Sequence, residues 1–125
     1  MATFELGFEK FKEIALADGI TLIDFWADWC GPCRMFGPIF EDVSEANPDI
    51  KFAKVDTEAE QQLAGDLGIS SIPTLMIFRD GVLLYREAGA LPEEALTDIV
   101  SQVRALDMTD IKREISEATE TETEK

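Results

Sequence analysis

The pattern of apolar and polar positions along the chain predicts strands and helices that alternate. Residues 21–27, TLIDFWA, are apolar on both faces of a strand except at Asp24, which is typical of a strand buried inside a mostly parallel sheet. Residues 8–17 instead place apolar side chains at helical spacing on one face. The predicted strands are residues 2–6, 21–27, 50–56, 74–78 and 82–88. The predicted helices are residues 8–17, a segment from the cysteines to about residue 46, a segment between Thr57 and Gly68, and residues 92–106.

Capping and turn residues support these boundaries. Thr57 and Glu60 have the spacing of a capping box, and Gly68 stands where a helix would end. Pro92 suits the first turn of the last helix. The predicted core face of the helix after the cysteines is Met35, Phe36, Ile39, Phe40 and Val43, and that of the last helix is Leu96, Ile99, Val100, Val103 and Leu106. The order of elements predicts an α/β domain with a mixed sheet and helices on both faces.

The composition changes after Leu106. Residues 107–125 carry seven acidic and three basic residues. Met108, Ile111 and Ile115 are spaced for a brief amphipathic helix, whereas residues 116–125 have one alanine and no larger apolar side chain. Such a segment cannot bury apolar surface, so we expect disorder from about residue 116. The sequence therefore predicts a domain over residues 1–106 and an acidic extension over residues 107–125.

The net charge of the chain argues against two classes of partner. With 11 basic and 26 acidic residues the formal charge is −15, which disfavours nucleic acids and anionic membranes, because both are polyanions. The N-terminus lacks the basic and apolar regions of a secretory signal, and no apolar stretch approaches 18 residues. We therefore expect a cytoplasmic protein, working as a monomer.

Cys30 and Cys33, the two cysteines of the chain, are separated by Gly31 and Pro32 at a predicted strand-to-helix junction. A helix N-terminus favours a thiolate, and Pro32 fits a first turn where its missing N–H has no intrahelical partner. The spacing suits a disulfide that opens and closes in redox exchange. Cys30, nearer the loop, is expected to be the exposed attacking thiol, and Cys33 the buried resolving thiol.

Other interpretations of the cysteine pair are weaker. A structural zinc site usually needs four cysteine or histidine ligands, and this chain has two cysteines and no histidine. An iron–sulfur cluster shared by a dimer is the one metal option left. A purely structural disulfide is disfavoured, because closing so short a loop constrains the unfolded chain very little.

Asp24 is a carboxylate inside an apolar strand, six residues before the first cysteine. Burial of a carboxylate is unfavourable and tends to keep it protonated, so Asp24 is a candidate proton acceptor for the thiol pair. The alternative is an aspartate at a solvated strand end. Lys54, on the neighbouring predicted strand, is either an electrostatic partner of Asp24 or a surface lysine.

Two further positions suit the approach of a second chain. Pro73 directly precedes a strand, and a cis bond there would let Ile72 present its backbone to a substrate. Gly89 and Ala90 follow the last strand, where small residues leave room for another chain, although a turn explains them equally well.

The segments DFWADWCGPCRMFGPIF, AKVD, SIPTLMIFRDG and GAL occur in the order and spacing of the thioredoxin family. The resemblance covers most of the chain, from about Phe8 to Leu106, and WCGPC with a downstream IPT is a specific combination. It implies a thioredoxin fold, with a five-stranded mixed sheet flanked by four helices. It also implies a general dithiol–disulfide oxidoreductase with no bound cofactor or metal.

The resemblance further implies roles for residues and partners. Cys30 would be the nucleophile, Cys33 the resolving thiol, Asp24 the buried acid–base residue, and Lys54 its neighbour. The implied substrate groove is Trp29, Gly31, Pro32, Ile72, Pro73 (in cis), Gly89 and Ala90. Electrons would come from a flavin-dependent thioredoxin reductase and NADPH, and the substrates would be proteins with disulfides. A binding subunit without turnover and an iron–sulfur dimer remain the alternatives.

Overall fold

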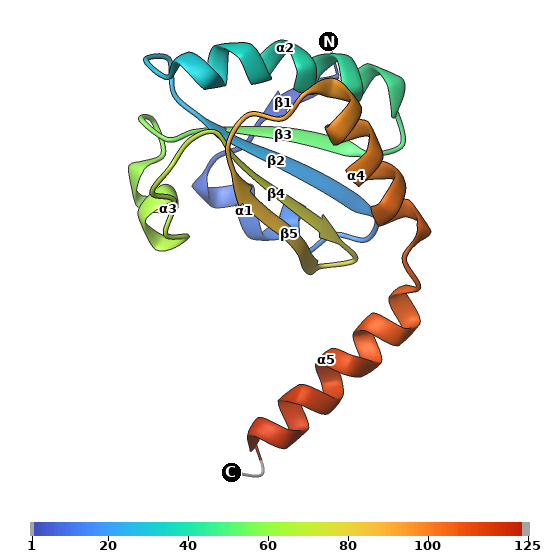
Figure 1. The fold of residues 1–125 in the computed structure, drawn as a ribbon. Helices are drawn as coiled ribbons and strands as arrows, with labels where there is room; N and C mark the ends of the chain where they lie inside the picture. Colours follow the sequence, from blue (N-terminus) through green and yellow to red (C-terminus); the bar gives the residue numbers. More distant parts are fainter. Residues whose placement is uncertain (1, 124–125) are drawn as a thin grey trace.

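The computed structural model of the 125-residue chain describes residues 2–123. The strands are β1 (Thr3–Glu5), β2 (Ile20–Trp26), β3 (Lys51–Asp56), β4 (Thr74–Arg79) and β5 (Val82–Ala88). The helices are α1 (Phe8–Ala15), α2 (Gly31–Ala46), α3 (Gln61–Asp66), α4 (Glu93–Ala105) and α5 (Met108–Thr123). Figure 1 shows the first four helices around the sheet and α5 extending away from it.

The strands form one mixed sheet in the order β1-β3-β2-β4-β5. β1, β3 and β2 are parallel, and β4 is antiparallel to both β2 and β5. Helices α2 and α4 supply the apolar core on one face, and α1 and α3 supply the core on the other. The expected five-stranded mixed sheet flanked by four helices is therefore confirmed.

The central strand β2 contributes to both cores because successive side chains of a strand point to opposite faces. Leu22 belongs to the core beneath α2 and α4, whereas Ile23 and Phe25 belong to the core beneath α1 and α3. Asp24 shares the face of Leu22. The carboxylate predicted to interrupt a buried strand therefore lies on the side of the sheet that α2 covers.

Two predicted chain reversals are confirmed. Gly68 follows the C-cap of α3 with φ +67°, and its N–H donates to the carbonyl of Gly65 at 3.0 Å. Asp80 and Gly81 join β4 to β5 with φ values of 53° and 80°, the conformation of a type I′ hairpin turn.

The predicted capping box at Thr57 is wrong. α3 begins at Gln61, and the hydroxyl of Thr57 donates instead to the carbonyl of Trp26 at 3.0 Å. The carboxylate of Asp56 accepts the N–H groups that follow it, from Glu58 and Ala59. A hydrogen bond to the neighbouring strand therefore competes successfully with the local cap.

Met35 is not a core residue, contrary to the helical pattern of α2. It is 71% exposed, whereas Phe36, Phe40 and Val43 are buried at the spacing i, i+4, i+7. A residue one position before such a stripe points about 100° away from it, which accounts for the exposure of Met35.

The chain continues as helix α5 to Thr123, which differs from the expected disorder from about residue 116. Arg113 pairs with Asp110 at 3.4 Å and with Glu117 at 3.9 Å along the helix. Residues 124 and 125 lie outside the described residues.

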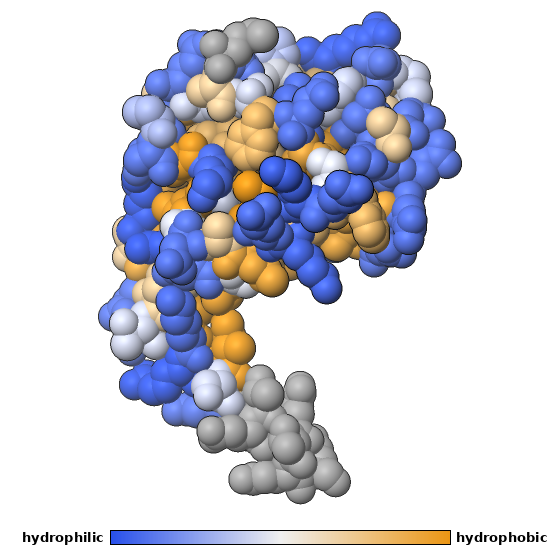
Figure 2. Space-filling model, turned by 180° about the vertical axis from the view of Figure 1, so that it is seen from behind, coloured by the Kyte–Doolittle hydropathy of each residue, from blue (hydrophilic) through white to orange (hydrophobic). Residues whose placement is uncertain are grey.

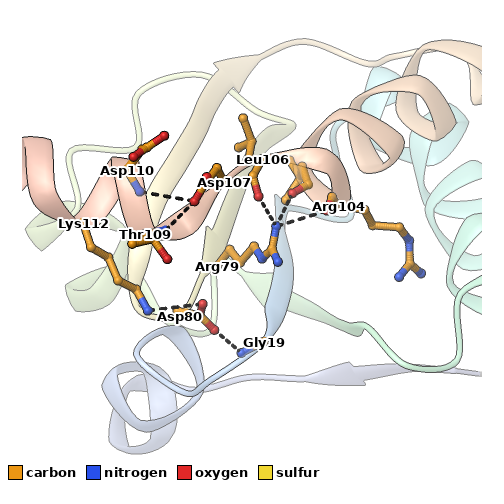
Figure 3. Close-up of polar contacts among 10 residues, drawn as sticks. Gly19, Arg79, Asp80, Arg104, Leu106, Asp107, Thr109, Asp110 and Lys112 are labelled. Carbon is orange, nitrogen blue, oxygen red and sulfur yellow. Dashed lines mark hydrogen bonds and ion pairs between the residues drawn. The ribbon is translucent and has the colours of Figure 1, made fainter.

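Figure 3 shows how α5 is joined to the domain. The Nη1 atom of Arg79 donates to the carbonyls of Val103, Arg104 and Leu106 at 2.8, 3.2 and 3.1 Å, where α4 ends. Leu106, predicted on the core face of α4, is the C-cap and is 38% exposed. Asp107 then accepts from the backbone at the start of α5.

Two further contacts hold the first turns of α5. Lys112 pairs with Asp80 of the β4–β5 turn at 3.4 Å, and Met108 is buried. Further along the helix Ile115 is 46% exposed. Seen from behind, the domain surface shows both hydrophilic and apolar areas, and apolar side chains continue along one side of α5 (Figure 2).

Candidate active site

The cysteine pair lies at the junction of β2 and α2, as predicted. Cys30 is the N-cap of α2, its N–H donates to the carbonyl of Ala27 at 3.2 Å, and Pro32 occupies the first turn. The side chain of Arg34 donates to the carbonyl of Asp28 at 3.0 Å. These bonds tie the loop before the helix to the helix itself.

Cys30 and Cys33 form a disulfide with 5.2 Å between their Cα atoms. The backbone N–H of Cys33 donates to the sulfur of Cys30 at 3.2 Å. N–H groups at a helix N-terminus and the positive end of the helix dipole stabilise negative charge. The sulfur of Cys30 therefore lies where a thiolate is favoured.

The expected difference in burial between the two cysteines is absent. Cys30 is 4% exposed and Cys33 is 5% exposed, because the side chain of Cys30 lies against the loop before β4. The two residues differ instead in their surroundings. The Sγ atom of Cys30 lies 3.6 Å from the carbonyl oxygen of Ile72, whereas Cys33 lines a cavity with Trp26 and Lys54.

The loop before β4 brings together the residues predicted for a second chain. The Ile72–Pro73 peptide bond is cis. The carbonyl of Pro73 accepts the N–H of Gly89 at 2.8 Å, and Gly89 has φ +112°. Ile72, Gly89 and the exposed Ala90 are thus linked to the same side of the domain as the sulfur of Cys30.

Exposed side chains surround the disulfide on α2 and the loop before it. Gly31 and Pro32 are exposed, and Trp29 is 66% exposed. The indole N–H of Trp29 donates to Glu58 at 2.7 Å. Met35 follows on the same helix face, three residues after Pro32. The sequence analysis predicted neither Glu58 nor Met35 as a residue of the site. Glu58 has no unusual sequence context, and Met35 follows the helical pattern that placed it in the core.

Asp24 is fully buried, and neither carboxylate oxygen has a hydrogen-bond partner among the described residues. Desolvation by burial raises the pKa of Asp24 to about 7, although the positive charge of Lys54 lowers it. Burial disfavours the charged form of the carboxyl group. Its effect on the pKa is larger than that of Lys54, since the pKa is raised overall. The expectation of a buried carboxylate is confirmed.

Lys54 lies beside Asp24 because the two residues occupy paired positions of the parallel strands β2 and β3. Its Nζ atom lies over the ring of Trp26, 5.1 Å from the centroid. Lys54, Trp26 and Cys33 line a cavity of about 540 Å³ together with Gly37 and other residues. The cavity therefore links Lys54, the residue paired with Asp24, to the second cysteine.

Metal binding has no support in the part of the chain that the structure describes. No group of three or more histidine, cysteine, aspartate or glutamate side chains is arranged to hold a metal ion among residues 2–123. Among the same residues, no helix has the length and apolar character required to cross a membrane.

Comparison with known proteins gives a consistent result. The sequence model of the family described as Thioredoxin matches residues 2–102. "Putative thioredoxin 2" of Streptomyces coelicolor is 53% identical over 116 residues, which cover 93% of this chain and 87% of that protein. "Thioredoxin" of Bacillus subtilis is 40% identical over 87 residues, covering 69% of this chain and 84% of that protein.

Solved structures agree with the sequences. The crystal structure of Malassezia sympodialis thioredoxin has a TM-score of 0.73 at 34% identity, covering 82% of this chain and 93% of that one. A mutant thioredoxin from Halobacterium salinarum has a TM-score of 0.74 at 33% identity, covering 84% of this chain and 92% of that one. The fold and the paired cysteines define a disulfide oxidoreductase. Within this class, the chain belongs to the thioredoxin family.

Proposed function

We propose that the protein reduces disulfides of other proteins by exchange at Cys30 and Cys33. The thiolate of Cys30 attacks one sulfur of the substrate disulfide, whose S–S bond breaks as the other sulfur leaves and takes a proton from water. The thiolate of Cys33 then attacks the sulfur of Cys30, and the second substrate sulfur leaves. Two electrons have passed to the substrate, and the Cys30–Cys33 disulfide remains.

The observation that carries this proposal is the position of the disulfide at the N-terminus of α2. The N–H of Cys33 reaches the sulfur of Cys30 at 3.2 Å, an arrangement that favours Cys30 as the thiolate. Cys30 also faces the Ile72 carbonyl, on the side where a substrate would approach, whereas Cys33 lines the cavity that it shares with Trp26 and Lys54.

Asp24 is proposed to accept the proton of Cys33 during resolution of the mixed disulfide. Its pKa of about 7 suits proton exchange near neutral pH, since a general base works best when its pKa lies close to the working pH. Lys54 would favour the ionised carboxylate through its positive charge. The cavity shared by Lys54 and Cys33 provides a place for water between the two sites.

The proposed substrate groove surrounds Cys30. Its residues are Trp29, Gly31, Pro32, Ile72, Pro73, Gly89 and Ala90. Ile72 is half-buried and Pro73 is buried, whereas the other five residues are exposed. Apolar and small residues beside a reactive sulfur suit an extended substrate chain, which could pair with the backbone of Ile72. Met35 would extend this groove along α2.

The electrons are proposed to come from a thioredoxin reductase that uses flavin and NADPH, so that this chain carries the redox disulfide and no cofactor of its own. Membership of the thioredoxin family supports this assignment, because members of that family are generally reduced by a thioredoxin reductase. We propose in addition that the protein works as a monomer in the cytoplasm. The net charge of −15 supports a monomer, because like charges repel each other and keep copies of the chain apart.

The boundary between a domain of residues 1–106 and an extension of residues 107–125 is also a proposal. The family match ends at residue 102, and Leu106 is the C-cap of α4. The match to the Streptomyces protein spans 116 residues of this chain, so it must include residues of the extension.

Turnover in a disulfide-reduction assay tests the proposed function. Insulin is incubated with dithiothreitol at a concentration that reduces the insulin disulfides only slowly. The protein is expected to accelerate this reduction catalytically. Cys30→Ser and Cys33→Ser should each abolish multiple turnover. Unchanged turnover with either variant would overturn the mechanism, and absence of turnover in the unmodified protein would favour a binding module.

A further inference from the structure

Gly37 lies in the interior of α2, where glycine is less favourable than alanine. A β-carbon built at this position would lie 3.7 Å from the Nζ atom of Lys54. The ammonium group therefore lies within ordinary contact distance of the point where a side chain at position 37 would begin.

Two elements hold Lys54 in this position. The ring of Trp26, at the end of β2, lies 5.1 Å from its Nζ atom on one side, and α2 approaches at Gly37. Lys54 is also the residue paired with Asp24 between β3 and β2. Its charge acts on a carboxylate that has no hydrogen-bond partner among the described residues.

Other charged groups line the same cavity. Besides Lys54 of β3, they are Asp28 of the β2–α2 loop and Arg34 and Glu41 of α2. Cys33 of α2 can titrate only when the disulfide is reduced. On the other side of β2, β4 places the uncharged Leu75 opposite Asp24. Among the described residues, Lys54 is the cation whose charge lowers the pKa of Asp24.

We propose that Gly37 is a positioning residue, which leaves room for the ammonium of Lys54 beside Asp24 and keeps the cavity next to Cys33 open. The inference rests on the proposed role of Asp24 in proton transfer only for its effect on turnover. Its effect on the ionisation of Asp24 is independent of that role and can be measured without any substrate.

A simpler explanation of Gly37 is that it precedes Pro38, since proline restricts the backbone of the residue before it. That explanation concerns the backbone alone. It predicts that substitutions destabilise α2 without any change in the titration of Asp24, so the two explanations give different results.

The decisive measurement is a carbon-13 NMR titration of the Asp24 carboxyl group in the oxidised protein, where the cysteines do not titrate. Gly37→Leu should displace the ammonium and raise the titration midpoint by about one pH unit, because the attraction of a nearby cation is lost. Gly37→Ala should cause a smaller shift, since 3.7 Å is an ordinary contact distance. Gly65→Leu is the matched control, a helical glycine of α3 with open space around it, and should cause no shift.

Lys54→Met provides a second variant and a test of coupling. It should raise the midpoint by a similar amount, and Gly37→Leu added to it should cause no further shift, because both changes act on one charge. If leucine prevents folding, Gly37→Met is titrated in its place. An unchanged midpoint in the Gly37 variant, or a full additional shift in the Lys54→Met background, would overturn the proposal.

Measurements of turnover test the positioning role of Gly37 separately from the proton-acceptor role of Asp24. A midpoint one unit above 7 leaves about one tenth of Asp24 ionised at pH 7 instead of about half, so resolution should slow about fivefold. If Asp24→Asn turns over normally while Gly37→Leu shifts the titration, the positioning role stands and the proton-acceptor role fails.

Discussion

Asp24 and Lys54 occupy paired positions on the adjacent parallel strands β2 and β3. The pairing places one positive charge beside a carboxylate that is otherwise surrounded by the core beneath α2. Burial nevertheless outweighs this attraction, so the pKa of Asp24 rises to about 7. Burial of this one carboxylate thus makes the stability of the fold depend on pH between about 4 and about 7.

Asp24→Asn should change how stability varies with pH. In the unfolded chain the pKa of an aspartate is ~3.9, whereas folded Asp24 titrates near 7, so the folded state binds more protons between these values. The stability of the unmodified protein should therefore fall as pH rises from about 4 to about 7. The accumulated loss is about 4 kcal/mol and persists above pH 7, and the variant should escape it.

Urea unfolding of the oxidised proteins at several pH values from 4 to 9 measures this difference. Asp42→Asn, at an exposed carboxylate of α2, is the control and should follow the unmodified protein. Equal slopes for Asp24→Asn and the unmodified protein would show that Asp24 titrates normally. Activity should fall together with the gain in stability, as expected of a functional residue in an unfavourable environment.

The two cysteines should trap substrates unequally although their burial is nearly equal. Cys33→Ser leaves the sulfur at the N-terminus of α2 free to attack, but the mixed disulfide cannot be resolved. Covalent adducts should accumulate and be released by dithiothreitol, whereas Cys30→Ser should trap almost nothing. Non-reducing electrophoresis with a disulfide-containing protein detects the adducts. Equal trapping by the two variants would contradict the assignment of Cys30 as the attacking thiol and Cys33 as the resolving thiol.

Trp29 should contribute to substrate binding through its exposed ring, and Glu58 should orient it. Trp29→Ala is expected to raise KM for a protein substrate about tenfold, since aromatic side chains at the centre of an interface contribute strongly to binding. Glu58→Leu, which removes the hydrogen-bond acceptor, should raise KM about threefold.

Two variants complete the measurement of KM. Glu58→Gln keeps an acceptor oxygen and should restore a nearly normal KM. Leu83→Ala changes an exposed apolar residue of β5 outside the proposed groove and should have no effect. The orienting role of Glu58 is wrong if the leucine and glutamine variants behave alike.

Arg79→Met should destabilise the junction of α4 and α5. The guanidinium donates to three carbonyls at the end of α4, and hydrogen bonds to a charged group contribute about 1.5–3 kcal/mol. We expect a loss of about 2 kcal/mol in urea unfolding at pH 7. Arg86→Met removes a single bond, to the carbonyl of Gly68, and this bond is exposed to solvent. Solvent competes for both groups, so the loss should be about 1 kcal/mol or less. Similar losses for both variants would show that the triple contact is no more stabilising than one bond.

The sheet and the position of the site could be predicted from the sequence because their signals are local. Asp24 stands out in an apolar strand, and the cysteines lie between a strand pattern and a helix pattern. Pro73 at a strand start and Gly68 after a helix carry information in their own backbone chemistry. Each of these features is confirmed by the structure.

Features that depend on a partner from another element could not be predicted in this way. The hydroxyl of Thr57 has an acceptor on β2, and the indole of Trp29 has one at Glu58. Cys30 is buried by a loop more than 40 residues away in the chain, at Ile72. Periodicity describes one segment at a time, and therefore gives no information on such pairs.

The hydrogen bonds from Arg79 to the end of α4 also fix the place where α5 leaves the domain, and this place suits the attachment of labels or supports. α5 begins where α4 ends, at the opposite end of the sheet from the start of α2, as Figure 1 shows. A dye, bead or fused protein attached to the outer turns of α5 would therefore stand clear of the disulfide. Immobilised through this helix, the molecule would present its reactive sulfurs to solution, and its turnover on a solid support should match that of the free protein.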